Sequence, residues 1–369
     1  MKYILPILII TLSGFLFQIP AITRQSPNEK KIDMQISLGE NMFAKGEHLK
    51  AIKHLMSAQE LARDSNYKEW ECLAYYNLGV CYFYMCQNGE ALDNFQRAYN
   101  IDLELSKNDK KRKEVSKNIS IMILNGIASV FFEQGKFDMC RKFVTKAYNM
   151  AKKANDPEMI KTLAGDMVLL NNKEKKFNEA EKYLTIARKF AYENCNDLAT
   201  FDTYEAETRF HQKDYDKVLN LASSIMKNDC ASPDNKGLIM IYLINIYSER
   251  GEFQKAAAYE SEAARLCSLK NKDYLFESLS SMYERSGNLS KALEMKDSMI
   301  TYHDSVIKLN NQRLVQGANT KLEIIKYKAE TEKQIAMIHQ RYILWVSGGC
   351  ILLLILVITL IAINRQKSK

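Results

Sequence analysis

The chain has 369 residues, of which 47% are apolar and 26% are charged, and its formal net charge is +8 at pH 7. This composition is ordinary for a folded protein and excludes a wholly disordered chain. Only 14 Gly and 5 Pro are present, which argues against a sandwich, a barrel or a Rossmann-type sheet, because those folds need many turns. The positive charge is spread along the chain, so we do not infer nucleic-acid binding.

The N-terminal segment is apolar. Residues 3–23 carry no charge and follow a single basic residue, Lys2. A basic start before an apolar stretch is typical of a signal peptide, although the large Ile19 fits poorly at a cleavage site that prefers small residues. We therefore expect residues 1–21 to be a signal peptide, and a retained N-terminal anchor is the alternative.

One pattern recurs seven times between residues 32 and 300, at intervals of 36 to 49 residues. Each copy has a small or compact residue at a fixed place, and in most copies a large apolar residue follows four positions later. A glycine that permits a tight turn precedes four copies. We interpret each copy as two antiparallel helices, which stack on their neighbours because one pair cannot bury its apolar face alone. The small position holds Ala51, Ala91, Cys140, Ala180, Val218, Ala256 and Ala292.

The second copy carries Leu78-Gly79, Tyr82, Ala91 and Phe95 at the offsets of the tetratricopeptide repeat (TPR) consensus. Over residues 32–300 the chain therefore resembles a TPR protein. The fifth copy departs from the consensus, with Glu205-Ala206 where Leu-Gly is expected. The resemblance implies an all-α fold, a TPR-like helical-hairpin solenoid of about seven units.

A helical pattern continues after the last copy, over residues 301–341. Five apolar residues there recur at alternating steps of three and four, which is the spacing of a coiled-coil seam. We predict a helical stalk that forms a parallel homodimer, and a solitary helix folded back on the last repeat is the alternative. The predicted seam consists of Val315, Ala318, Leu322, Ile325 and Ala329.

Residues 343–363 form a run of 21 uncharged residues, long enough as a helix to cross a hydrocarbon core of about 30 Å. We predict a transmembrane helix at 342–364 and, from three basic residues after it, a cytoplasmic tail at 365–369. The TPR region would then lie on the periplasmic side of a bacterial cell membrane. This order is similar to the sensor half of membrane-tethered bacterial TPR regulators without their cytoplasmic output domain, so no DNA-binding or kinase activity is implied.

The TPR resemblance implies a concave face lined by the first helix of each unit. Asn side chains there can bond an extended peptide backbone, and aromatic side chains can anchor apolar groups. Ordinary packing between repeats is the alternative role for these residues. The candidate ligand-binding residues are Tyr76, Val80, Phe83, Asn125, Ser129, Phe132, Leu169, Asn172, Thr203, Glu207, Phe210, Ile241 and Asn245.

No catalytic motif is recognisable, and the five His are too scattered to suggest a metal site. We expect no enzyme activity, no cofactor and no bound metal, and we expect the cysteines to be buried free thiols. The predicted function is binding of a protein or peptide ligand as the sensor or scaffold component of a signalling system. A static envelope-assembly scaffold, or the remnant of a TPR transcriptional regulator that lost its DNA-binding domain, is the alternative.

Overall fold

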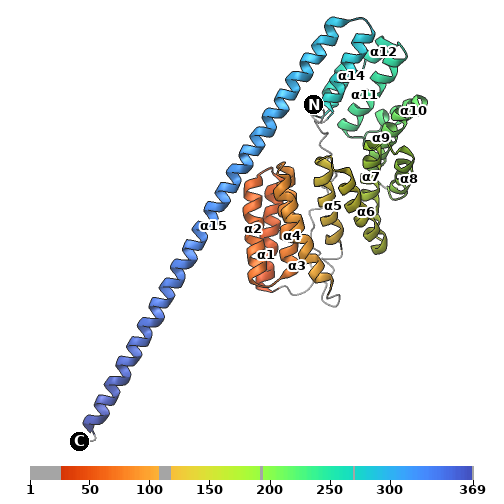
Figure 1. The fold of residues 1–369 in the computed structure, drawn as a ribbon. Coiled ribbons are helices and arrows are strands. Elements are labelled where there is room, and N and C mark those ends of the chain that lie inside the picture. Colours follow the sequence, from red (N-terminus) through yellow and green to blue (C-terminus); the bar gives the residue numbers. More distant parts are fainter. Residues whose placement is uncertain (1–25, 108–117, 192–193, 269–270, 368–369) are drawn as a thin grey trace. The chain divides into compact units, whose positions relative to one another are not determined.

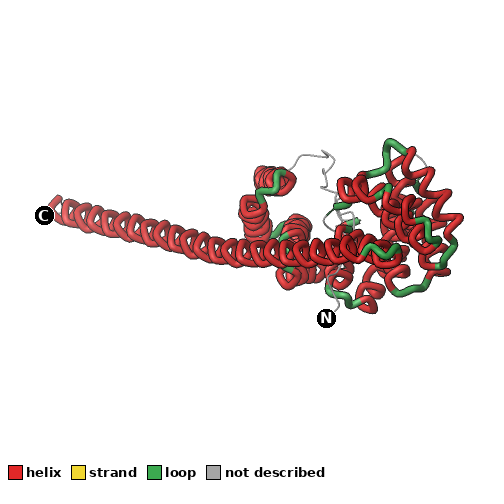
Figure 2. The backbone as a smooth tube through the Cα atoms, turned by 90° about the horizontal axis from the view of Figure 1, so that it is seen from above, coloured by secondary structure: helices red, strands yellow, loops and turns green. Residues whose placement is uncertain are grey.

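The computed structural model describes residues 26–107, 118–191, 194–268 and 271–367, and it describes the side chains of the last helix only in part, up to residue 349. The predicted signal peptide at 1–21 lies outside these residues. Every regular element within these ranges is a helix (Figures 1 and 2), which confirms the prediction of an all-α fold. The chain divides into two compact units, residues 1–313 and residues 314–369.

The described part of the first unit contains seven helical hairpins, and each begins with a helix that we call the first helix of its pair (Figure 1). The second helix of the sixth hairpin is broken into two pieces. The hairpins are α1 (Pro27–Ala44) with α2 (His48–Asp64), α3 (Lys68–Tyr84) with α4 (Asn88–Ser106), α5 (Ile119–Glu133) with α6 (Phe137–Ala154), α7 (Pro157–Lys173) with α8 (Phe177–Lys189), α9 (Cys195–His211) with α10 (Tyr215–Lys227), α11 (Pro233–Glu249) with α12 (Phe253–Ala257) and α13 (Glu260–Leu266), and α14 (Lys272–Arg285) with the start of α15 (Leu289–Lys367).

Local sequence explains where the helices begin and turn. Helices α1, α7 and α11 each start with proline after a Ser or Asp whose side chain accepts a backbone N–H of the first turn. Within each hairpin, one residue between the two helices has a positive φ. Glycine occupies this place in four hairpins, as predicted, and the others place a non-glycine residue there. The seven turn residues are Gly46, Cys86, Gly135, Lys175, Lys213, Gly251 and Gly287.

Close helix packing explains the small residues. The seven residues at the small position are all buried. In the second hairpin, a Cβ atom added to Gly79 would lie 2.6 Å from Cδ1 of Phe95. The same ring also meets Gly126 of the third hairpin, where an added Cβ would lie 2.7 Å from Cζ. Phe95 thus fills the space between two glycine-bearing first helices, which requires both glycines.

A disulfide joins Cys195, the first residue of α9, to Cys230 in the loop that precedes α11. It closes one complete hairpin at its open end, where both residues are exposed. The expectation of buried free thiols is therefore wrong for this pair. Among the described cysteines it holds for Cys72, Cys81, Cys140 and Cys267, which are free and buried, whereas Cys86 is free and half-buried.

The last helix, α15, runs for 79 residues, so the second helix of the seventh hairpin and the predicted stalk belong to one helix. In the predicted seam, the side chains of Val315, Leu322 and Ala329 are exposed. The side chains of Ala318 and Ile325 lie outside the described residues. Pairing of this seam with a second copy stays a prediction.

The prediction of a transmembrane helix at 342–364 needs correction. Within the residues that the structure describes, none of the helices combines the length and the apolar character that a membrane crossing requires. The single-pass membrane location, and the two sides assigned to the TPR region and to the tail at 365–369, rested on that helix and are corrected with it.

Candidate functional site

The first helices of the hairpins pack on one another in sequence, so that they form a continuous face within the first unit. Polar side chains bridge neighbouring first helices along it. Asn77 on α3 donates to Glu40 on α1 at 3.2 Å, and Asn245 on α11 donates to Ser278 on α14 at 2.8 Å. We call this the first-helix face.

The candidate ligand residues all lie on first helices, but most of their side chains are buried. The ring of Tyr76 packs on Phe95 and that of Phe132 on Phe137, each on the second helix of the same hairpin. The aromatic anchors expected at Phe83 and Phe132 are both buried, and their role in ligand binding stays a prediction. The buried members are Tyr76, Phe83, Asn125, Ser129, Phe132, Leu169, Asn172, Thr203 and Ile241, and the half-buried members are Val80, Glu207, Phe210 and Asn245.

The predicted peptide-binding Asn residues join adjacent repeats. Asn172 on α7 accepts a hydrogen bond from Thr208 Oγ1 at 3.0 Å, and its Nδ2 donates to Glu207 at 3.4 Å. Asn245 donates to the carbonyl oxygen of Ile241 as well as to Ser278. Both side chains are therefore already held by protein partners, which fixes their orientation before any ligand arrives.

A buried carboxyl lies between α5 and α7. Burial raises the pKa of Asp166 from 3.8 to about 7, although a hydrogen bond with Asn125 opposes the shift. Asp166 Oδ2 and Asn125 Oδ1 are both buried without a hydrogen-bond partner among the described residues. At α1, burial likewise raises the pKa of Glu40 to about 7 against a hydrogen bond from Asn77. The first-helix face thus contains two carboxyls that change charge near neutral pH.

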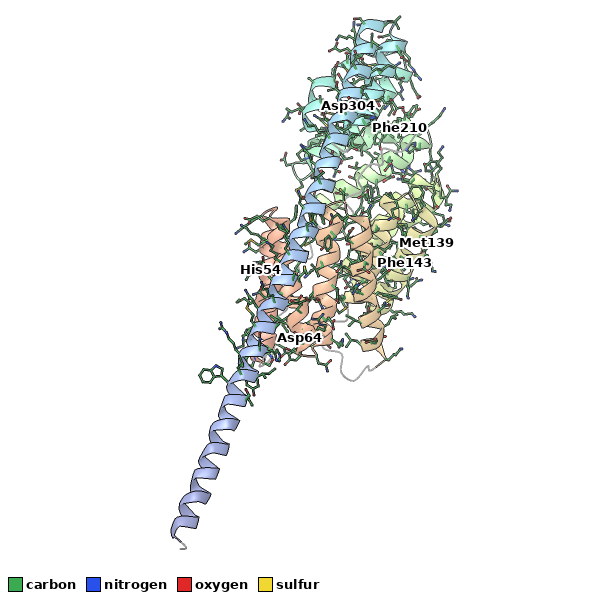
Figure 3. All side chains as sticks on the ribbon, turned by 60° about the vertical axis from the view of Figure 1, so that its left-hand side comes forward. His54, Asp64, Met139, Phe143, Phe210 and Asp304 are labelled. Carbon is green, nitrogen blue, oxygen red and sulfur yellow. A yellow bond between two sulfur atoms is a disulfide. The ribbon has the colours of Figure 1, made fainter. Side chains whose placement is uncertain are left out.

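The fifth to seventh hairpins bring an acid and three aromatic rings together. Figure 3 labels Phe210 among the side chains of this region. Its ring stacks on Tyr242 with centroids 4.9 Å apart, and Tyr242 meets Tyr274 edge-on at 6.2 Å. Burial raises the pKa of both tyrosines, and the carboxylate of Glu207 raises them further. We call Glu207, Phe210, Tyr242 and Tyr274 the aromatic–acidic cluster.

Sequence reasoning identified Glu207 and Phe210 but missed Tyr242 and Tyr274. Phe210 lies three residues before the turn of its hairpin, whereas Tyr242 lies nine and Tyr274 thirteen residues before theirs. The three rings therefore meet although each lies at a different distance in sequence from the turn of its hairpin. A search at one consensus offset cannot find all three. The tyrosine content of α11 and α14 was the only available signal.

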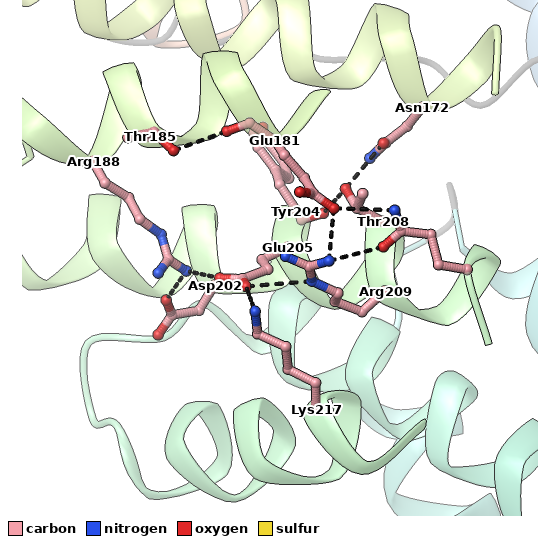
Figure 4. Close-up of polar contacts among 11 residues, drawn as sticks. Asn172, Glu181, Thr185, Arg188, Asp202, Tyr204, Glu205, Thr208, Arg209 and Lys217 are labelled. Atoms are coloured by element: carbon pink, nitrogen blue, oxygen red, sulfur yellow. Dashed lines mark hydrogen bonds and ion pairs between the residues drawn. The ribbon is translucent and has the colours of Figure 1, made fainter. Parts of the chain in front are cut away.

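A second polar group holds the fourth and fifth hairpins together (Figure 4). Glu205 on α9 is buried, and its carboxylate lies 2.8 Å from Arg188 on α8 and 3.0 Å from Lys217 on α10. Burial raises the pKa of Glu205, but the hydrogen bond from Lys217 and the nearby positive charges outweigh it, so that the net shift is downward. This carboxylate occupies the place of the consensus Leu-Gly, and ion pairs replace apolar packing there.

Metal-ligating side chains do not gather in the part of the chain that the structure describes. No group of three His, Cys, Asp or Glu residues suited to an ion occurs among those residues. The described His residues make other contacts: His211 stacks on Phe177, and His303 pairs with Asp273 at 2.5 Å.

Comparison with known proteins agrees with this geometry. Residues 32–104 match the family model described as tetratricopeptide repeat. The human antiviral innate immune response effector IFIT1 is 22% identical over 261 residues, or 67% of this chain. The chain spans about half the length of that relative, 51%.

Solved structures show the same fold. The apo form of RapI has a TM-score of 0.62 at 15% identity, covering 75% of this chain and 99% of that one. A TPR protein from Parabacteroides merdae has a TM-score of 0.54 at 15% identity, covering 77% and 98%. NprR in complex with its cognate peptide NprX has a TM-score of 0.53 at 14% identity, covering 77% and 82%. The family match over residues 32–104, the seven described hairpins and these neighbours together support a tetratricopeptide repeat fold for the chain.

Proposed function

We propose that the chain binds a protein or peptide segment along its first-helix face, at the aromatic–acidic cluster, and that it acts as a non-enzymatic sensor or scaffold component of a signalling system. The observation that carries this proposal is the position of Glu207. Its side chain is 14% exposed and lies 4.0 Å from Nζ of Lys173. It accepts a hydrogen bond from Asn172, and its charge acts on Tyr242 and Tyr274. A partly desolvated carboxylate beside aromatic rings suits a cationic side chain next to a large apolar one.

Two further observations support a peptide as the ligand. The cluster joins side chains from three successive hairpins, so it extends along the solenoid as an extended chain would. NprR, one of the structural neighbours, is solved with its cognate peptide. The proposed ligand therefore contains Lys or Arg beside a large apolar residue.

The test is a selection from a random peptide library displayed on phage, with the full chain immobilised. We expect enriched sequences to share a basic residue beside a large apolar one. Glu207→Gln should weaken the selected peptides about tenfold, because the charge-assisted contact is lost while the hydrogen bond to Asn172 can persist. Glu179→Gln removes one negative charge from an exposed site on α8 and serves as the matched control.

Either of two outcomes would contradict the proposal. One is equal binding of the selected peptides by the wild type and by Glu207→Gln, at unchanged thermal stability. The other is enrichment without any basic or apolar preference. Both would leave the aromatic–acidic cluster with a packing role only.

A further inference from the structure

In the third to fifth hairpins, side chains at two positions of the second helix contact the first helix of the next hairpin. They lie six and thirteen residues after the turn residue of each hairpin. In the third hairpin, Arg141 lies six residues after Gly135 and donates to Asn171 on α7 at 2.9 Å. In the fourth, Glu181 lies six residues after Lys175 and accepts from Arg209 on α9 at 2.6 Å.

The position thirteen residues after the turn makes such contacts in the fourth and fifth hairpins, whereas in the third hairpin Tyr148 meets Tyr183 on α8. In the fourth hairpin it is Arg188, which reaches Glu205 on α9 at 2.8 Å. In the fifth hairpin the two positions are Leu219 and Met226, which pack against apolar clusters that include α11. Ion pairs or apolar contacts at these two positions therefore attach the first helix of the following hairpin in the fourth and fifth hairpins, whereas Ala264 at the second position of the sixth hairpin is exposed.

In the seventh hairpin the same two positions are Leu293 and Ile300, six and thirteen residues after Gly287. Their side chains are 61% and 58% exposed. Leu289 and Ile307 extend the stripe and are also exposed. Beside Leu293, a groove of about 650 Å³ lies between α14 and α15, with Phe276 and Tyr302 in its lining. The end of the solenoid thus presents the attachment surface for an eighth first helix, without such a helix among the described residues.

The basic and acidic side chains around this surface differ in their contacts. Lys291 and Lys296 are directed toward α14, where they contact Tyr283 and Glu284. Asp297 and Glu294 line the groove together with one cation, Lys272. Asp297 and Asp304 have no hydrogen bond or ion pair to any described residue. Figure 3 labels Asp304 on this part of α15. The open side of the surface is therefore apolar with acidic groups that lack partners.

We propose that this end face, formed by Leu289, Leu293, Ile300, Ile307 and the groove beside α14, binds a basic amphipathic helix of a partner protein. The helix would replace the missing eighth first helix. Its apolar pattern follows from the preceding junction, where α14 contributes Leu275, Leu279 and Met282 to the cluster shared with the sixth hairpin. These residues have i, i+4 and i+7 spacing, which puts them on one face of a helix. Lys or Arg beside that stripe would pair with Asp297 and Asp304.

The test uses two acetylated and amidated peptides and the full chain. The probe has the sequence of α14 with Asp273→Lys, Glu277→Lys and Glu284→Lys, and the control peptide keeps the native acids. Fluorescence anisotropy should show that the probe binds at least tenfold more tightly than the control peptide, with an affinity that falls as salt rises. Leu293→Glu in the chain should weaken the probe at least tenfold, because it places a carboxylate at a central apolar contact.

Leu293 is largely exposed, so this change leaves the fold intact, and unchanged thermal unfolding would verify that. Met34→Glu, at a residue 56% exposed on α1, is the matched control and should bind the probe like the wild type. Equal binding of the two peptides, or undiminished binding of the probe to Leu293→Glu, would overturn the proposal. A wild-type dimer in sedimentation that Leu293→Glu converts to a monomer would also overturn it, since the end face would then belong to a second copy.

Discussion

The guanidinium Nη2 of Arg188 lies 2.8 Å from Oε2 of Glu205, and this pair joins the second helix of the fourth hairpin to the first helix of the fifth. Glu205 occupies a place where the TPR consensus has Leu-Gly. At this departure from the consensus, charged side chains join the two hairpins. Arg209 and Lys217 complete the charge balance around the same carboxylate.

Replacing Glu205 by Ala should destabilise the chain by about 2–3 kcal/mol, because three cations would lose a buried counter-charge. Asp216→Ala is the matched control, since it removes an exposed ion pair with Arg250 and should cost less than about 1 kcal/mol. Urea unfolding followed by circular dichroism measures both. A cost for Glu205→Ala no larger than that for Asp216→Ala would show that the junction is held by apolar packing alone.

Stability should fall as pH rises toward neutrality, because of Asp166. The folded-state pKa of this carboxyl is raised from 3.8 to about 7, so folding takes up a proton between these values. Its contribution is fully present below about pH 4 and is lost as pH rises through 7. Asp166→Asn cannot ionise and should be more stable than the wild type at pH 8, by at most about 4 kcal/mol.

Thermal unfolding of both proteins from pH 4 to pH 8 measures this difference. The two curves should meet near pH 4, diverge progressively as pH rises toward 7, and run parallel above about pH 7. Glu40 should keep a residual slope in the variant, since its pKa is also raised to about 7. Parallel curves across the whole range would contradict a raised pKa at Asp166.

Gly79 should not tolerate a methyl group. The added Cβ would lie 2.6 Å from the ring of Phe95, and that ring is itself fixed between two first helices. We expect Gly79→Ala to destabilise the chain by about 1–3 kcal/mol through overpacking. Gly89→Ala is the control, because nothing lies within 4 Å of its added Cβ. Gly89→Ala should be neutral or slightly stabilising, and equal effects at the two sites would refute the close approach.

Reduction should weaken the fifth hairpin. The Cys195–Cys230 disulfide spans 35 residues of sequence, and a loop of that length corresponds to roughly 3–4 kcal/mol in the chain-entropy model. The Cys195→Ser, Cys230→Ser double variant should therefore unfold at a lower temperature than the oxidised wild type. Adding a reductant should lower the wild type to the same value and leave the variant unchanged. A variant that still responds to reductant would indicate a different disulfide.

The predicted stalk seam can be tested by crosslinking. Leu322→Cys, with Cys86→Ser and Cys350→Ser to remove competing thiols, should give a symmetric disulfide-linked dimer if two stalks pair in parallel. The exposed Lys333→Cys on the same helix is the control and should crosslink more slowly. A monomer at both positions would leave the solitary helix as the better description.

The sequence alone determined the repeat architecture. A compact residue recurring every 36 to 49 residues and a turn glycine define hairpins locally, because helix pairing depends on residues close in sequence. The positive φ at Gly46, Gly135, Gly251 and Gly287 and the burial of the small position were predictable for that reason. The prediction of a transmembrane helix at 342–364 relied on apolar length alone and needed correction from the described structure.

The tertiary structure decided which of the candidate site residues remain accessible. Phe83, Asn125 and Phe132 have the residue types of a ligand site, yet the folded chain buries them, Phe132 against Phe137 of the same hairpin. Tyr242 and Tyr274 lie near Phe210 although the three residues are at different distances in sequence from the turns of their hairpins. No single consensus offset predicts this arrangement. The exposed stripe at Leu293 and Ile300 can be interpreted only by comparison with the earlier hairpins. The equivalent residues there contact the following repeat, which the sequence alone does not reveal.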